Sequence, residues 1–175
     1  TSMPSSTTYY TSLQWTCNDN FSPITSYSIY RGNTTNSLSY YDTSPSSPYV
    51  VTTSLDYGST YYFGVVAINS VGTSSSSNIV SFVPYTIPLQ PTQLTAHALD
   101  KAVSLTWSPP TNDGGNALLN YELRYLNLSV LLSKDLQQYN VTSLTNGISY
   151  TFNLYSKNNA GYSTIASTTT ASPST

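Results

Sequence analysis

Very few side chains in this sequence could do acid–base or nucleophilic chemistry. There is one histidine, His97, one cysteine, Cys17, and seven carboxylates scattered along 175 residues. Nucleophilic catalysis needs a nucleophile, a base and a group that orients the base, all within hydrogen-bond reach. No such set can be assembled from these residues. The sequence therefore predicts no catalytic residues and no cofactor, and we interpret the chain as a protein without enzymatic activity.

Two short segments resemble fragments of calcium-binding loops. They read Asn18-Asp19-Asn20 and Asn112-Asp113-Gly114, and each offers one carboxylate where a calcium loop uses several. We interpret both as turns, so no metal site is predicted. The single Cys17 excludes a disulfide within the chain. Because Cys17 lies two residues after Trp15, we expect both side chains on the inward face of one strand, with a buried free thiol.

Covalent modification is the remaining chemistry that the sequence offers. Four N-x-S/T sequons occur, at Asn20, Asn33, Asn127 and Asn140. Asn, Ser and Thr are so common here that composition alone accounts for this number. Their positions are more informative, because three fall in expected loops and Asn140 should point outward between Tyr139 and Val141. N-glycosylation of these four residues is a hypothesis that depends on a secretory origin.

The surface chemistry is dominated by uncharged polar groups. Charged residues make up 7% of the chain, and the formal net charge is −2. No basic patch exists, so we expect no nucleic-acid partner. No apolar run is long enough to predict a membrane span in this segment. The start at Thr1, without a signal peptide, favours a processed or excised segment. A surface rich in Ser, Thr, Asn and Tyr suits an extracellular, cell-surface or virion-surface location, and function over a wide or acidic pH range.

The elements that position these residues come in two copies. Leu55, Gly58, Tyr61 and Phe63 recur 89 residues later in the segment Leu144–Leu154. Leu13-Gln14-Trp15 matches Leu105-Thr106-Trp107 at an offset of 92, and further matches preserve the same order. The offsets drift only as loops lengthen. The sequence therefore predicts two domains, over residues 1–86 and 87–175, joined by a short proline-containing linker.

Alternation of apolar and polar residues predicts strands throughout and gives no helical period. In the first copy we expect strands at about 2–7, 9–17, 25–31, near 39, 49–53, 59–69 and 76–83. In the second copy we expect them at about 92–98, 102–108, 119–126, 128–132, 138–142, 148–157 and 162–170. Seven short strands per copy predict an all-β chain of two tandem immunoglobulin-like β-sandwiches.

The second copy resembles a fibronectin type III domain. The resemblance rests on Pro91, Leu105-x-Trp107 with Pro109-Pro110, Tyr121-x-Leu123-x-Tyr125, Leu144-x-x-Gly147-x-x-Tyr150-x-Phe152, and Asn158-x-x-Gly161. The first copy is similar but more divergent, because Cys17-Asn18 replaces the double proline.

The family implies seven-stranded sandwiches that serve as spacers, adhesion modules or ligand-binding surfaces. The integrin-binding Arg-Gly-Asp motif is absent from both corresponding loops, at Asn69–Gly72 and Asn158–Gly161. Trp15, Trp107, Tyr61 and Tyr150 are predicted core residues. Each of the two tyrosines should pin the turn before its strand through its hydroxyl.

Three hypotheses about function remain open. The first is a non-enzymatic module of an extracellular or surface-exposed protein, which provides spacing, adhesion or assembly and binds other proteins or copies of itself. The second is an accessory region of a secreted carbohydrate-active enzyme, in which exposed tyrosines such as Tyr40, Tyr41, Tyr57 and Tyr62 stack on surface glycans. The third is a virion or filament subunit whose open sheet edges pair with neighbouring copies.

Overall fold

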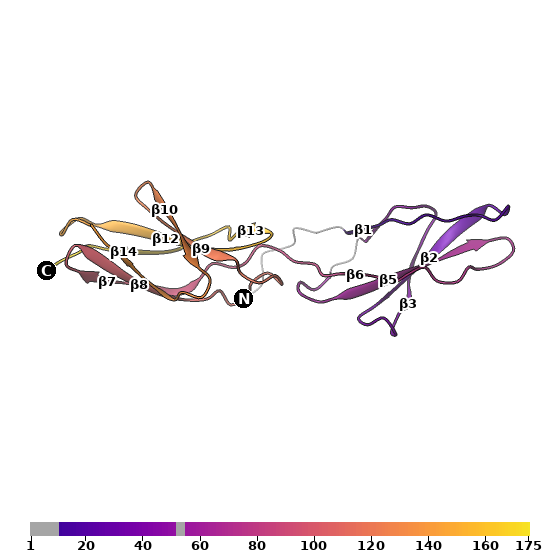
Figure 1. Cartoon of the computed structure of the whole chain (residues 1–175), viewed down its shortest axis with the longest axis horizontal. Helices are drawn as coiled ribbons and strands as arrows, with labels where there is room; N and C mark the ends of the chain where they lie inside the picture. The colour runs from indigo at the N-terminus through magenta and orange to yellow at the C-terminus, as the bar shows by residue number, and fades with distance from the viewer. Residues whose placement is uncertain (1–10, 52–54) are drawn as a thin grey trace. The chain divides into compact units, whose positions relative to one another are not determined.

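The computed structural model describes residues 11–51 and 55–175, and the chain divides into two compact units, Thr1–Pro84 and Tyr85–Thr175 (Figure 1). The described residues form strands, turns and irregular segments, without any helix. The predicted all-β fold of two tandem immunoglobulin-like β-sandwiches is confirmed. The strand expected at about 2–7 lies outside the described residues.

Unit 2 is a sandwich of a three-stranded and a five-stranded sheet. The first has the order β11-β8-β7, with β7 at Thr92–Leu99, β8 at Ala102–Ser108 and β11 at Gln138–Val141. The second has β9 at Asn120–Tyr125 between β10, Leu128–Ser133, and β12, Tyr150–Asn158. The short β13, Gly161–Tyr162, and β14, Ser167–Ala171, both pair with β12. They are two parts of one last strand.

Unit 1 has the same two-layer plan over its described residues. One sheet pairs β1, Thr11–Leu13, with β4, Tyr49–Val51. The other has the order β3-β2-β5-β6, with β2 at Ile24–Gly32, β3 at Ser39–Ser44, β5 at Tyr61–Asn69 and β6 at Val80–Phe82.

The two units share strand register and not only strand order. Tyr61 pairs with Phe82 in unit 1, and Tyr150 pairs with Ala171 in unit 2, so both partners are displaced by the same 89 positions. The turn glycines agree as well. Gly58 and Gly147 have φ values of 80° and 79°, the left-handed region that favours glycine. The N–H of Gly58 donates to the carbonyl of Pro84 at 2.8 Å, and Gly147 makes the equivalent bond at 2.9 Å.

Several predicted strands are shorter or broken in the structure. The strand expected at 9–17 is described only over Thr11–Leu13, and the chain leaves the sheet before Trp15. Alternation therefore does not continue to Cys17, whose thiol is exposed, and the prediction of a buried thiol is wrong. β12 begins two residues later than expected, which leaves Ile148 52% exposed.

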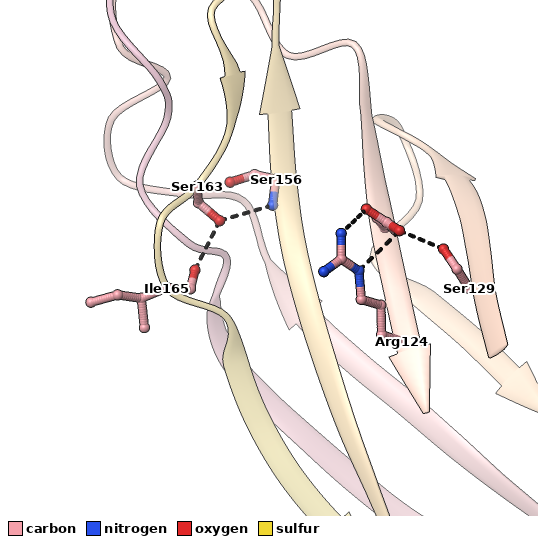
Figure 2. A network of polar contacts seen from close by, with 6 residues as sticks. Arg124, Ser129, Ser156, Ser163 and Ile165 are labelled. Carbon is pink, nitrogen blue, oxygen red and sulfur yellow. Dashed lines mark hydrogen bonds and ion pairs between the residues drawn. The ribbon is translucent and has the colours of Figure 1, made fainter. Parts of the chain in front are cut away.

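The serine-rich segments after β5 and β12 explain the other differences. In unit 2, the Ser163 hydroxyl accepts a hydrogen bond from the N–H of Ser156 and donates one to the carbonyl of Ile165 (Figure 2). In unit 1, the Ser74 and Ser77 hydroxyls accept from the N–H groups of Ala67 and Val65. Hydroxyl oxygens thus replace carbonyl oxygens beside these strands. This interrupts the expected strand 162–170 and reduces the expected strand 76–83 to β6.

Candidate functional site

The two predicted turn-pinning tyrosines lie at equivalent positions in the two cores. Tyr61 and Tyr150 are each 7% exposed. The Tyr61 hydroxyl accepts a hydrogen bond from the N–H of Asp56 at 3.0 Å, and the Tyr150 hydroxyl accepts one from the N–H of Thr145, also at 3.0 Å. Each hydroxyl therefore satisfies a backbone donor of the turn that precedes its strand. This geometry is that of a tyrosine corner.

The two tryptophans are placed differently. Trp107 is buried in the core of unit 2 and meets the ring of Tyr121 edge to face, with centroids 5.6 Å apart. Trp15 meets Tyr27 in the same way at 5.1 Å, but it is only partly buried against the core of unit 1. Trp15 lies beyond the end of β1, which accounts for its greater exposure.

The side chains that could do chemistry are dispersed. Within residues 11–51 and 55–175, no group of three or more His, Cys, Asp and Glu side chains could hold a metal ion. His97 is exposed on β7. In the segment Asn18–Asn20 the Asn18 side chain accepts from the N–H of Asn20, and in the segment Asn112–Gly114 the Asn112 side chain accepts from the N–H of Gly114. The side-chain oxygens of both loops are thus used to close turns.

All four sequon asparagines are exposed. Asn20 lies in the loop before β2, Asn33 follows β2, and Asn127 lies in the turn between β9 and β10. Asn140 lies within β11 opposite Ser104. Each side chain could therefore carry a glycan without displacing core residues.

The tyrosines proposed to stack on sugars do not form one exposed platform. Tyr40 is 61% exposed, whereas Tyr57 and Tyr62 are half-buried. Tyr41 packs against the core of unit 1, edge to face on Phe63 with centroids 6.4 Å apart. The expectation of exposed side chains is therefore wrong for Tyr41, Tyr57 and Tyr62, which are all half-buried.

A polar cluster on the outer face of the five-stranded sheet was not predicted. The Arg124 Nε and Nη2 atoms donate to the two carboxylate oxygens of Glu122 at 3.0 and 2.8 Å, and the Ser129 hydroxyl donates to the same carboxylate (Figure 2). Glu122 is only 7% exposed. The Arg124 guanidinium, supported by Ser129, holds the pKa of Glu122 at about 2 although burial acts to raise it.

Tyrosine rings cover the cations of this face. The guanidinium of Arg124 lies 4.6 Å from the ring centroid of Tyr155, and the ammonium of Lys157 lies 4.6 Å from that of Tyr162. Because Tyr155 pairs with Glu122 across the sheet, these contacts follow from strand register. The alternation of β9 and β12 would have revealed this cluster had the register been known. The face offers flat aromatic and cationic surface for protein contact.

A second exposed feature is the loop tip of unit 1, formed by the loop 18–23 before β2 and the loop 69–73 after β5. Phe21 is 104% exposed and Val71 is 85% exposed at this tip. The Ser22 and Ser70 hydroxyls lie 3.3 Å apart, and the side-chain amide of Asn69 donates to the carbonyl of Ser22 at 3.3 Å. The two loops therefore support one another and present two apolar side chains to solvent.

The strand order, the register and the tyrosine corner of unit 2 together point to one family. Residues 89–172 match the model of the fibronectin type III domain. Fibronectin type III domains are commonly protein-interaction or structural modules and are generally non-catalytic. In the described residues no helix is both long and apolar enough for a membrane span.

The chain is also similar to two longer archaeal proteins. It is 34% identical over 114 residues to the Kelch domain-containing protein SSO1033 of Saccharolobus solfataricus, a match that covers 63% of this chain and 16% of the relative. It is 31% identical over 160 residues to a Kelch domain-containing protein of Sulfurisphaera tokodaii, covering 80% of this chain and 22% of the relative. Each match covers a larger part of this chain than either unit makes up alone, so both similarities include residues of unit 1 and of unit 2. The chain spans less than a quarter of either relative.

Among solved structures, the crystal structure of chicken CNTN1 FN1-FN3 domains is similar to this chain with a TM-score of 0.49 and 19% identity. That match covers 86% of this chain and 56% of the chicken chain.

Proposed function

We propose that this chain is a non-enzymatic spacing and interaction region of a longer, extracellular or surface-exposed protein. It consists of two tandem fibronectin type III-like domains, residues 1–86 and 87–175. The observation that carries the proposal is the combination of two separate sandwiches with a chain length that is a small part of its relatives. Two compact units in which few reactive side chains lie close together are suited to hold other parts of a protein at a fixed distance and to present a surface for binding. Both relatives are named as Kelch domain-containing proteins.

Other proteins, or further copies of this chain, are the partners that fit these surfaces best. Low charge leaves recognition to hydrogen bonds, aromatic rings and apolar contacts, and such groups are available on the outer face of the five-stranded sheet and at the tip of unit 1. A surface location also fits the four exposed sequons. Glycosylation of Asn20, Asn33, Asn127 and Asn140 belongs to this proposal.

The spacing role is tested by replacement in the native protein that carries this segment. Residues 1–175 are exchanged for two unrelated β-sandwich domains of similar length, and separately deleted. A pure spacer predicts that the replacement restores the assembly lost on deletion, whereas an interaction module predicts that it does not. Retention of normal assembly after deletion would overturn both roles.

The location is tested on intact cells with an amine reagent that does not cross membranes. Labelling of Lys101 and Lys157 before lysis is expected for a surface protein. Labelling only after lysis would overturn the surface location. Glycopeptide mass spectrometry of the same sample tests the four sequons directly.

A further inference from the structure

The five-stranded sheet of unit 2 ends at β10, whose outer edge pairs with no strand of the described residues. Such an edge presents a row of free N–H and C=O groups, and proteins usually protect it with charged residues, proline, a β-bulge or a short strand. β10 has none of these protections. Its six residues, Leu128–Ser133, carry no charge and no proline, and its register with β9 is continuous. The edge is therefore open to a further strand.

The corresponding edge strand of unit 1 is protected. β3 forms a hairpin with β2 as β10 does with β9. However, β3 carries the exposed Asp42, and its register with β2 shifts between Ile29 and Tyr30, as at a β-bulge. At an edge of the three-stranded sheet, β11 has only four residues. β10 thus differs from these strands in charge, register or length, and each difference favours pairing.

Hairpin geometry identifies the backbone groups that are free on β10. A two-residue turn joins β9 to β10, and Tyr125 faces Leu128 where this turn closes. The closing residues of such a turn form a hydrogen-bonded pair, and such pairs then alternate along the ladder. Ser129, Leu131 and Ser133 therefore direct their N–H and C=O groups away from β9. The side chain of Ser129 turns back over β9 and leaves this edge clear (Figure 2).

A second copy of the same strand fits these groups. Two copies of β10 can pair antiparallel about a two-fold axis, which places the same surface on both sides. With Leu131 on the axis, it faces its own copy, and Ser129 faces Ser133 of the second copy. The N–H and C=O of Leu131 then bond across the axis, and the N–H of Ser133 donates to the carbonyl of Ser129. Counted from both sides, this register gives about four backbone hydrogen bonds. The carbonyl of Ser133 is not among them, because it accepts from the N–H of Leu136 at 3.1 Å.

Side chains favour the same register. Leu131 is 64% exposed on the outer face of the sheet. With this residue on the axis, the two leucine side chains lie side by side and remove apolar surface from water. Charge does not oppose the contact. Lys134, which follows the strand, lies 2.8 Å from the carboxylate of Asp135, so each edge is locally neutral.

We propose that the β10 edge is the site at which two copies of this chain associate, through antiparallel pairing of β10 with β10 about Leu131. The two five-stranded sheets then form one continuous sheet. The inference rests on the proposed function as an interaction region and names the partner as a second copy. A contact through one short strand is small, so we expect a dissociation constant on the order of 100 μM.

Sedimentation equilibrium of the 175-residue chain, from about 10 μM to about 1 mM, tests the association. Leu131→Lys places like charges opposite one another at the axis and should weaken the dimer at least about tenfold. Ile165→Lys is the matched control, because it adds the same charge at a side chain that is 63% exposed outside β10, and it should leave the dimer unchanged. A monomer at all concentrations, or equal effects of the two variants, would overturn the proposal.

Disulfide crosslinking tests the register in a Cys17→Ser background. Leu131→Cys places two thiols opposite one another, with Cα atoms about 5.5 Å apart, within the range of a disulfide. Ser133→Cys is the control, because in this register it lies about 13 Å along the strand from its own copy. Mild oxidation should give a covalent dimer of Leu131→Cys only. No such dimer, or equal yields from both variants, would contradict the register. The domain-replacement test still decides the interaction role, so the two failures are distinguishable.

Discussion

The ion pair between Glu122 and Arg124 stabilises unit 2, and acid removes this stabilisation. The pKa of Glu122 is lowered to about 2 in the folded state, from an ordinary value of 4.5. A carboxyl group whose pKa is lower when folded stabilises the protein above its unfolded pKa. This contribution is lost as the pH falls from about 4.5 towards 2. Glu122→Gln removes the charge and keeps the shape of the side chain.

The expected size follows from the shift and the exposure of the partner. A lowering of this extent corresponds to about 3 kcal/mol when it is fully expressed. The Arg124 side chain is 47% exposed, so water screens part of the attraction, and we expect Glu122→Gln to lower the free energy of unfolding of unit 2 by about 1–2 kcal/mol at pH 7. At pH 2 the wild-type carboxyl is about half protonated in the folded state and almost fully protonated in the unfolded state, so the difference should shrink to a fraction of that value.

Urea unfolding measures the difference when the fluorescence of Trp107 is followed in a Trp15→Phe background. Asp135→Asn is the matched control, because its ion pair with Lys134 is exposed on both sides and should contribute little. The reasoning is refuted if Glu122→Gln is as mild as this control at pH 7. It is also refuted if its deficit is as large at pH 2 as at pH 7.

Three further predictions concern single positions. Tyr150→Phe should lower the free energy of unfolding of unit 2 by about 1 kcal/mol in the same urea assay, because the N–H of Thr145 loses its acceptor; an unchanged midpoint would contradict this. Gly114→Ala should cost more than about 2 kcal/mol by thermal unfolding, because its φ is +79° and a Cβ there would lie 2.2 Å from the carbonyl oxygen of Thr86; a cost near zero would contradict the packing described. Cys17 should react fully with a thiol reagent such as DTNB in the native protein, at a rate matching that in urea, whereas a buried thiol would react only after unfolding.

The fold could be predicted because its signals are local. Alternation along β12 and a turn glycine before it define a strand and its inward face without knowledge of the rest of the chain. The repeat then carries the same assignment to β5, where the register is the same. The strand predictions failed at Cys17 and over the first residues of the strand expected at 76–83. There, serine hydroxyls or loop turns replace strand hydrogen bonds, and alternation cannot show this because Ser fits either environment.

The candidate surfaces could not be predicted because they join distant segments. In unit 2 the segment Thr86–Leu89 lies against Asn158, although Thr86 and Asn158 are 72 residues apart in the sequence, and the hydrogen bonds that hold the segment use its own backbone atoms. Contacts made through the backbone do not restrict which residue types occur, except that a glycine is needed where another segment comes close. Gly114 and Gly161 are such glycines, but each also fits a simple turn, so neither could be interpreted from the sequence. Which loops this segment joins is therefore a property of the fold and not of the sequence motif.

Few of the contacts that the cationic side chains of this chain make are weakened by acid. Of the five, Arg31, Arg124 and Lys157 lie over tyrosine rings. A carboxylate loses its attraction for a cation when it is protonated, whereas the face of an aromatic ring stays attractive at any acidic pH. Glu122 is the one carboxylate in the described residues that is both buried and paired with a cation. Tyrosine thus takes over part of the role that acidic residues usually have, which gives a physical reason for a surface of low charge and many tyrosines. Such a protein keeps most of the contacts of its cations at an acidic pH, at which ion pairs with carboxylates are lost.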